Sequence, residues 1–155
     1  MAATRRIERA QPTDDDALMV PRPLARAGRV EVDATWGEVQ PLALAPGVET
    51  VGELEVRAHA ERGLPLVDSR LAHFHAEGTI AGARSIPHEE MGERIGELDP
   101  AQPTILFCNG PQCTATPDAI RTLLDAGYPA EALRYYRGGM HDWTTLGFPV
   151  APGAG

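Results

Sequence analysis

Short apolar runs recur along the chain from about residue 46 onward, and each is bounded by polar, glycine or proline residues. Two of them, Leu64–Asp68 and Thr104–Cys108, stop at a charged or reactive residue. Short apolar runs of this kind are typical of strands buried on both faces of a parallel sheet. The expected strands are Val48–Val51, Leu64–Asp68, Arg84–Ile86, Thr104–Cys108 and Leu133–Tyr136.

Helical patterns lie between these runs. Leu54 and Ala58 share one face of the first, and Thr116-Pro117 is typical of a helix start with threonine as N-cap and proline in the first helical position. Strands that alternate with helices predict an α/β fold, a parallel sheet covered on both faces. The expected helical segments are Glu53–Arg62, Ala72–Glu77, His88–Glu97, Thr116 to about Gly127, and a short element that holds Trp143.

The first 45 residues follow no regular pattern and contain four prolines. Arg29–Val32 and Glu38–Leu44 alternate partly and predict short strands. Two interpretations stay open for this extension: a docked β-rich arm, which would bury Trp36, Leu42 and Leu44, or a flexible tail. The predicted organisation is an extension over 1–45, a domain over 46–150 and a tail over 151–155.

The 155 residues, 43% hydrophobic and 23% charged, suit one domain with an extension. No apolar run approaches the roughly 20 residues of a membrane span. Arginines near the N-terminus lead into Asp14–Asp16 without an apolar stretch, so we expect no secretory signal and a cytoplasmic location. A net charge of −8 disfavours nucleic acid and anionic membranes, which leaves small molecules or proteins as partners.

Cys108 is the strongest candidate for chemistry. It ends a predicted buried strand, and a helix is expected to begin a few residues later. Backbone N–H groups of such a loop, with the positive end of a helix dipole, stabilise an anion and lower a thiol pKa from about 8.5. The pattern alone leaves a second interpretation open, in which Cys108 is a small buried apolar residue.

Four motifs in order make the chain resemble the rhodanese family. The resemblance covers about residues 48–150 and implies a five-stranded parallel sheet with helices on both sides. It also implies a cysteine that cycles between thiolate and persulfide, and Cys108 falls at that catalytic position. The motifs are Leu66-Val67-Asp68-Ser69-Arg70, the stretch from Glu77-Gly78-Thr79 to Ile86-Pro87, Ile105-Leu106-Phe107-Cys108, and Arg137-Gly138-Gly139-Met140-His141-Asp142-Trp143.

The chain departs from the family pattern in two places. Thr79 stands where a histidine is usual, at a position that we interpret as structural. More important, the loop after Cys108 lacks the arginine that commonly binds an anionic donor, and Pro111 removes one backbone donor. We therefore expect thiosulfate to be a poor donor. The candidate substrate-binding loop is Asn109, Gly110, Pro111, Gln112, Cys113 and Thr114.

Charges from elsewhere are candidates to support the site. We expect Asp68 and Arg70 to pair and to brace a strand-to-helix turn, whereas for Arg84 and Arg137 a site role and an ordinary ion pair stay equally open. His73 and His75, two positions apart on a helix, point to different sides, so no metal site is expected. No cofactor is expected either.

The predicted activity is sulfur transfer through a Cys108 persulfide. The donor would be thiosulfate, mercaptopyruvate or a small persulfide, and the acceptor a thiol, cyanide or a protein. A cysteine phosphatase is disfavoured because it needs an arginine in the loop. Two alternatives stay open: a thiol redox sensor that uses Cys108 and Cys113, and an idle domain that binds a partner. In the favoured interpretation Cys113 supplies only a backbone N–H to the loop.

Overall fold

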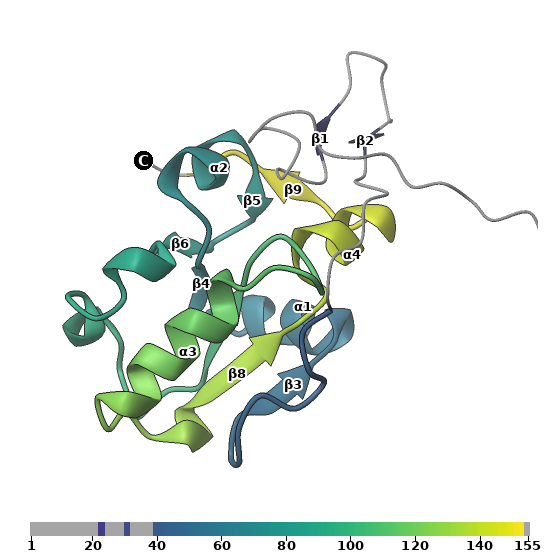
Figure 1. Cartoon of the computed structure of the whole chain (residues 1–155). Helices are drawn as coiled ribbons and strands as arrows, with labels where there is room; N and C mark the ends of the chain where they lie inside the picture. The colour runs from purple at the N-terminus through teal and green to yellow at the C-terminus, as the bar shows by residue number, and fades with distance from the viewer. Residues whose placement is uncertain (1–21, 24–29, 32–38, 154–155) are drawn as a thin grey trace, which may run out of the picture.

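The structure, a computed structural model, describes residues 22–23, 30–31 and 39–153. Its centre is a sheet of five parallel strands, which confirms the predicted fold class (Figure 1). In spatial order the strands are β3 (Glu49–Val51), β8 (Leu133–Tyr136), β7 (Thr104–Phe107), β4 (Leu66–Asp68) and β6 (Arg84–Ser85). Each predicted strand of the sheet is present.

Two small antiparallel pairs lie outside the central sheet. β1 (Arg22–Pro23) pairs with β2 (Val30–Glu31), and β5 (Thr79–Ile80) pairs with β9 (Val150–Ala151). Neither strand of the second pair is among the strands expected from the sequence. The pair joins the end of the chain to the segment that follows α2 (Ala72–Glu77), a helix found at its predicted bounds.

Alternate residues of the strands point to opposite faces of the sheet and build two cores. Leu106 and Tyr135 belong to the core under α3 (Ala115–Asp125), whereas Phe107 and Tyr136 belong to the other. That second core also receives side chains of α1 (Glu53–Glu61) and α4 (Gly139–Thr145). Figure 1 shows α3 in front of the sheet and α1 behind it, so helices cover both faces.

The buried face of α1 differs from the expected one. Val56 and His59 are buried, while Leu54 is 73% exposed and Ala58 is exposed as well. His59 can lie in the core because its Nε2 hydrogen-bonds to the Pro65 carbonyl at 2.7 Å. Burial lowers the pKa of this imidazole.

Two further helix predictions need correction. The segment His88–Glu97 forms two 3-10 turns, η2 (His88–Glu90) and η3 (Ile95–Glu97), because Gly92 and Gly96 disfavour a continuous α-helix. Helix α3 begins at Ala115 with Thr114 as its N-cap, rather than after Thr116. Pro117 is therefore the third helical residue, still within the first turn, where its missing N–H costs nothing.

The chain before β3 docks onto the domain without forming the strand predicted for Glu38–Leu44. Residues 39–44 are irregular; Leu42 is 72% exposed, and the half-buried Leu44 packs against the α3 core. Trp36 lies outside the described residues. The N–H of Gln40 donates to the Pro111 carbonyl at 2.6 Å, and Arg137 Nε donates to the Gln40 carbonyl at 2.8 Å. Docking therefore reaches the loop that follows Cys108.

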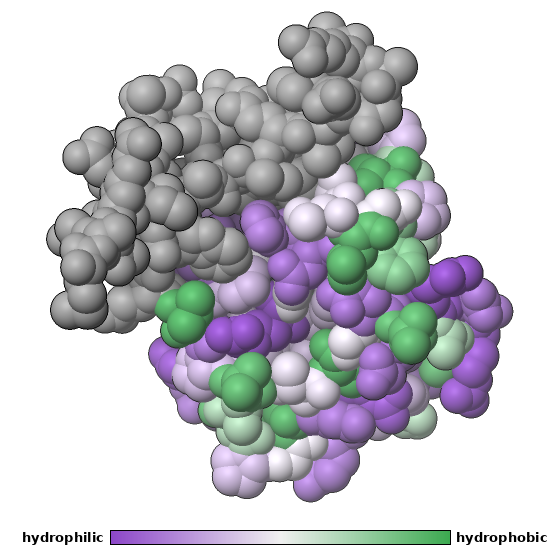
Figure 2. Space-filling view, turned by 90° about the vertical axis from the view of Figure 1, so that its right-hand side faces the viewer, coloured by the Kyte–Doolittle hydropathy of each residue, from purple (hydrophilic) through white to green (hydrophobic). Residues whose placement is uncertain are grey.

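On the face shown in Figure 2, hydrophobic residues lie as separate spots among polar ones. Within the described ranges, the helices are too short and too polar for any of them to cross a bilayer.

Candidate active site around Cys108

Cys108 directly follows β7, at the edge of the sheet where the parallel strands end. The same edge carries Ser69, after β4, and Arg137, after β8. The Ser69 N–H donates to the Phe107 carbonyl at 2.9 Å, which ties the two neighbouring strand ends together. Cys108 is only 1% exposed. The fold thus places a buried thiol at the edge where ligands of parallel sheets commonly bind.

The glycine pair at the start of α4, Gly138 and Gly139, packs directly against the start of the loop. Met140 N–H donates to the Cys108 carbonyl at 3.0 Å, and His141 N–H donates to the Asn109 carbonyl at 2.7 Å. Gly139 has φ +57°, and a Cβ there would lie 2.4 Å from the Cys108 carbonyl oxygen. Only glycine fits this close approach of two backbones. The Gly138-Gly139 motif therefore supports the position of Cys108.

A tight turn brings Cys113 back toward Cys108. The Cys113 N–H donates to the Gly110 carbonyl at 3.0 Å, so it closes the turn and is not offered to a ligand. The expectation that Cys113 supplies a backbone N–H to the loop is therefore wrong. Its thiol is what points inward: it hydrogen-bonds to the Cys108 thiol and receives the N–H groups of Asn109 and Ala115.

The Cys108 sulfur has its own partners. It lies 3.7 Å from the Cys113 carbonyl oxygen, and Thr116 N–H donates to it at 3.5 Å. Burial raises the pKa of Cys108 well above the ordinary thiol value, and the hydrogen bond with Cys113 raises it further. Thr116, whose N–H donates to this sulfur, opposes that rise only in part. Cys108 is thus the protonated member of the pair.

Cys113 is the charged member. The hydrogen bond from Cys108 lowers the pKa of Cys113 to about 7, even though burial opposes the change. The N–H groups of Ala115 and Asn109 and the positive charge of Arg70 favour the thiolate too. The sequence predicted a loop that stabilises a thiolate at Cys108. In the structure the loop stabilises the negative charge on the Cys113 thiol instead.

The expected pair of Asp68 and Arg70 is present and almost wholly buried. Arg70 Nε and one terminal nitrogen donate to the two carboxylate oxygens at 2.9 and 2.7 Å, and the same terminal nitrogen reaches the Gly78 carbonyl at 2.6 Å. The Thr79 hydroxyl also donates to Asp68, at 2.8 Å. Thr79 therefore has a structural contact here, as interpreted from the sequence. The network braces the turn after β4.

The other two candidate arginines lie in different settings. Arg84 pairs with Glu97 at 3.4 Å in an exposed position on β6, two strands away from β7. Arg137 follows β8, next to β7, and its Nε donates a hydrogen bond to the Gln40 carbonyl. The structure thus brings Arg137 close to the loop and keeps Arg84 apart from it.

Sequence reasoning missed several neighbours of the loop. His141 lies against it, since a Cβ at Gly110 would come within 3.0 Å of the His141 Cβ, and its Nδ1 is 2.9 Å from an Asp142 oxygen. Thr116 was interpreted only as a helix cap. Its place in the first turn of α3, immediately after the loop, was the signal that could have identified it.

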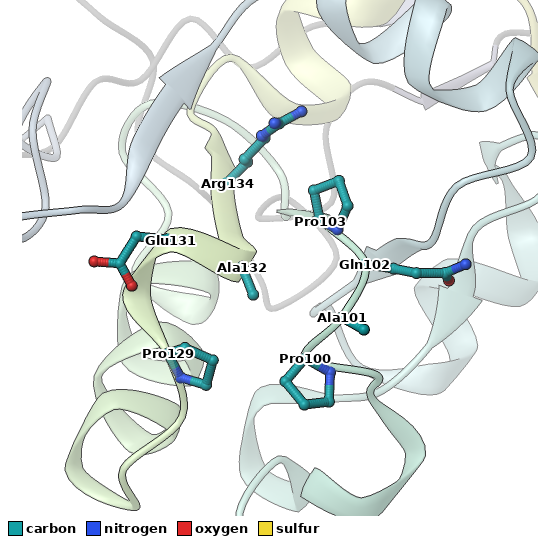
Figure 3. A pocket seen from close by; sticks show the side chains of 8 residues that line it. All are labelled: Pro100, Ala101, Gln102, Pro103, Pro129, Glu131, Ala132 and Arg134. Carbon is teal, nitrogen blue, oxygen red and sulfur yellow. The ribbon is translucent and has the colours of Figure 1, made fainter.

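The hollow in Figure 3 belongs to the opposite edge of the sheet, where β7 and β8 begin. Figure 3 shows it between two chain segments, one that leads into β7 and one that leads into β8. It is therefore separate from the cysteine pair. Its lining residues are Pro100, Ala101, Gln102, Pro103, Pro129, Glu131, Ala132 and Arg134.

Comparison with known proteins agrees with this architecture. The model of the rhodanese-like domain matches residues 50–146. A thiosulfate sulfurtransferase structure from Pseudomonas aeruginosa is 27% identical with a TM-score of 0.57, covering 69% of this chain and 21% of that one. A full-length Lactobacillus plantarum protein shares the fold at 24% identity and a TM-score of 0.57, covering 66% of this chain and 87% of that one.

A curated relative has a different description. An HTH-type transcriptional regulator of Mycobacterium tuberculosis is 34% identical over 107 residues, which are 68% of this chain and 46% of the regulator. The chain thus spans less than half the length of that relative. The family model matches more than half of the chain, and the structural neighbours share its fold. The chain belongs to the rhodanese-like domain family.

Proposed function

We propose that the chain is a sulfurtransferase that carries sulfane sulfur as a persulfide on Cys108. The observation that carries the proposal is the pair of hydrogen-bonded thiols at the end of β7, with the Cys108 thiol protonated and Cys113 able to hold a negative charge near neutral pH. This arrangement activates Cys108 as a nucleophile, because Cys113 is the base that accepts the Cys108 proton during the attack.

In the proposed first step the Cys108 sulfur attacks the outer sulfur of the donor. The Cys108 proton passes to the Cys113 thiolate, a new bond forms between the two sulfur atoms, and the bond that held the donor's outer sulfur breaks. The leaving group departs with that electron pair, as sulfite from thiosulfate or as a thiolate from a persulfide. Cys108 then carries a perthiolate, whose charge Thr116 N–H helps to stabilise.

In the second step an acceptor thiolate or cyanide attacks the outer sulfur and removes it. Cys108 leaves as a thiolate, and the proton held by Cys113 returns to it, which restores the starting pair. No metal or cofactor enters this scheme.

The geometry favours persulfide donors over thiosulfate. The six loop residues contain no arginine or lysine. Of the candidate cations, Arg70 is paired with Asp68, and Arg137 donates its Nε–H to the Gln40 carbonyl. A dianionic donor would also meet the negative charge of Cys113.

Intact-mass spectrometry tests the proposal. The protein is mixed in turn with thiosulfate, 3-mercaptopyruvate and glutathione persulfide, quenched by acid at short times and freed of excess reagent. We expect a gain of one sulfur atom per chain, reversed by cyanide, in the wild type and not in Cys108→Ser. A chain that gains no sulfur from any of the three donors would overturn the proposal.

A further inference from the structure

We propose that the chain has a second activity, the release of hydrosulfide: the Cys113 sulfur attacks the sulfur of the Cys108 persulfide, expels the outer sulfur and leaves a Cys108–Cys113 disulfide. The inference rests on the proposed function, because it begins from the Cys108 persulfide. It makes Cys113 a chemical participant and gives the bound sulfur a second outcome besides transfer to an acceptor.

The first support is the shape of the loop. The hydrogen bond from Cys113 N–H to the Gly110 carbonyl folds the chain back, and places the Cys113 carbonyl 3.7 Å from the Cys108 sulfur. The thiol of Cys113 turns inward as well, into a hydrogen bond with the Cys108 thiol. Two thiols that share a hydrogen bond need only a small rearrangement to form a disulfide.

Burial of Cys108 is the second support. At 1% exposure, this sulfur presents almost nothing to a thiol that arrives from solvent. Cys113 is already in place, and a reacting group held in contact acts at a far higher effective concentration than any free thiol. Attack on the inner sulfur by Cys113 therefore competes with removal of the outer sulfur by an external acceptor.

The polar surroundings of Cys113 are the third support. A cysteine that only fills space would lie among apolar side chains. The sulfur of Cys113 instead receives the N–H groups of Asn109 and Ala115 and lies in the field of Arg70, all of which favour its thiolate. Electron density on this sulfur is what attack on a persulfide requires.

Atoms and charges balance in this step. It starts from the Cys108 perthiolate and the protonated Cys113 that the first step of sulfur uptake leaves. The Cys113 proton first passes to the outer sulfur, and the resulting Cys113 thiolate bonds to the Cys108 sulfur. The bond to the outer sulfur breaks, and that sulfur departs with the electron pair as HS⁻. The sulfane sulfur is reduced and the two cysteines are oxidised. A low-molecular-weight thiol or a dithiol protein then reduces the disulfide for the next cycle.

The test is a single-turnover assay without an acceptor. The full chain is loaded with one equivalent of glutathione persulfide in mild acid, passed through a desalting column and brought to about pH 8. Sulfide is measured over time, and the mass of the protein before and after reduction reports persulfide or disulfide. Cys113→Ser and Cys113→Ala are treated in parallel, so that a defect specific to serine is recognised.

We expect the wild type to release about one sulfide per chain and to lose the mass of two hydrogen atoms relative to the reduced protein. Both variants should keep the persulfide and release sulfide at least about tenfold more slowly. The wild-type rate should not change on dilution, since the step is intramolecular.

The outcomes separate the two proposals. If the wild type loads and keeps its persulfide, or if the variants release sulfide as fast as the wild type, hydrosulfide release through Cys113 is wrong and the transferase stands. If neither the wild type nor the variants acquire sulfur, the transferase itself is wrong.

Discussion

The thiols of Cys108 and Cys113 form one hydrogen-bonded pair, in which the buried sulfur keeps the proton and the half-buried sulfur carries the charge. The fold creates this difference through the position of each residue. Cys108 continues a buried strand, where desolvation penalises a thiolate, whereas Cys113 receives the N–H groups of Asn109 and of Ala115, the first residue of α3.

Alkylation by iodoacetamide should therefore depend on pH in a characteristic way. With the pKa of Cys113 at about 7, its labelling rate should fall about tenfold per unit below that pH and level off above about pH 8. Cys108, with a raised pKa, should label only at higher pH. Peptide mass spectrometry distinguishes the two sites.

Cys108→Ala provides the matched control for that profile. It removes the hydrogen bond that lowers the pKa of Cys113, so the labelling midpoint should move up toward the free-thiol value of about 8.5. Wild-type labelling that begins at Cys108, or a midpoint that the substitution leaves unchanged, would contradict the described pair.

Donor preference gives a second prediction. In a cyanide-coupled assay we expect thiosulfate to turn over at least about tenfold less efficiently than glutathione persulfide, because no cation of the loop binds the sulfonate. Gln112→Arg should restore part of the thiosulfate activity and leave the persulfide rate nearly constant. Efficient thiosulfate turnover by the wild type would show that another residue binds the anion.

Gly139 gives a prediction about stability. Gly139→Ala has to place a Cβ at φ +57°, 2.4 Å from the Cys108 carbonyl oxygen, so we expect a loss of more than about 3 kcal/mol and of sulfur uptake. Gly147→Ala is the control: its φ is +84°, but the described atoms leave the Cβ position open, and it should cost only about 1–2 kcal/mol. Urea unfolding measures both. Equal losses would show that the backbone contact at Gly139 is unimportant.

The docked segment before β3 should contribute to stability. Leu44 packs on the core, and Gln40 bonds both Pro111 and Arg137, so deletion of residues 1–45 should lower the melting temperature by several degrees. Deletion of residues 1–38 is the control, because the difference between the two proteins reports residues 39–45 alone. Identical melting curves for the two truncated proteins would contradict the docking.

The main elements of the fold were predictable because each carries a local signal. The apolar runs before Cys108 and around Tyr135 are short and sharply bounded, and β8 has its predicted bounds. The face of α1 was not predictable from the same signal. His59 is buried only because a carbonyl outside the helix, that of Pro65, accepts its hydrogen bond.

The site was predicted in part for a similar reason. The position of Cys108 follows from the strand that it ends, and the pairing of Asp68 with Arg70 follows from their spacing. The direction of the Cys113 side chain does not follow from spacing. It depends on the turn that its N–H closes with Gly110, and on the start of α3 one residue earlier than Thr116.

Single-turnover loading, with the sulfur located by peptide mass spectrometry, tests the central claim that Cys108 carries the sulfur. The wild type, Cys108→Ser and Cys113→Ser are each mixed with one equivalent of glutathione persulfide and quenched at short times by acid. The account predicts sulfur on Cys108 in the wild type, slower loading at that same residue in Cys113→Ser, and none in Cys108→Ser with its circular dichroism unchanged. Sulfur found on Cys113 of Cys108→Ser at the wild-type rate, or no loading at all of Cys113→Ser, would contradict it.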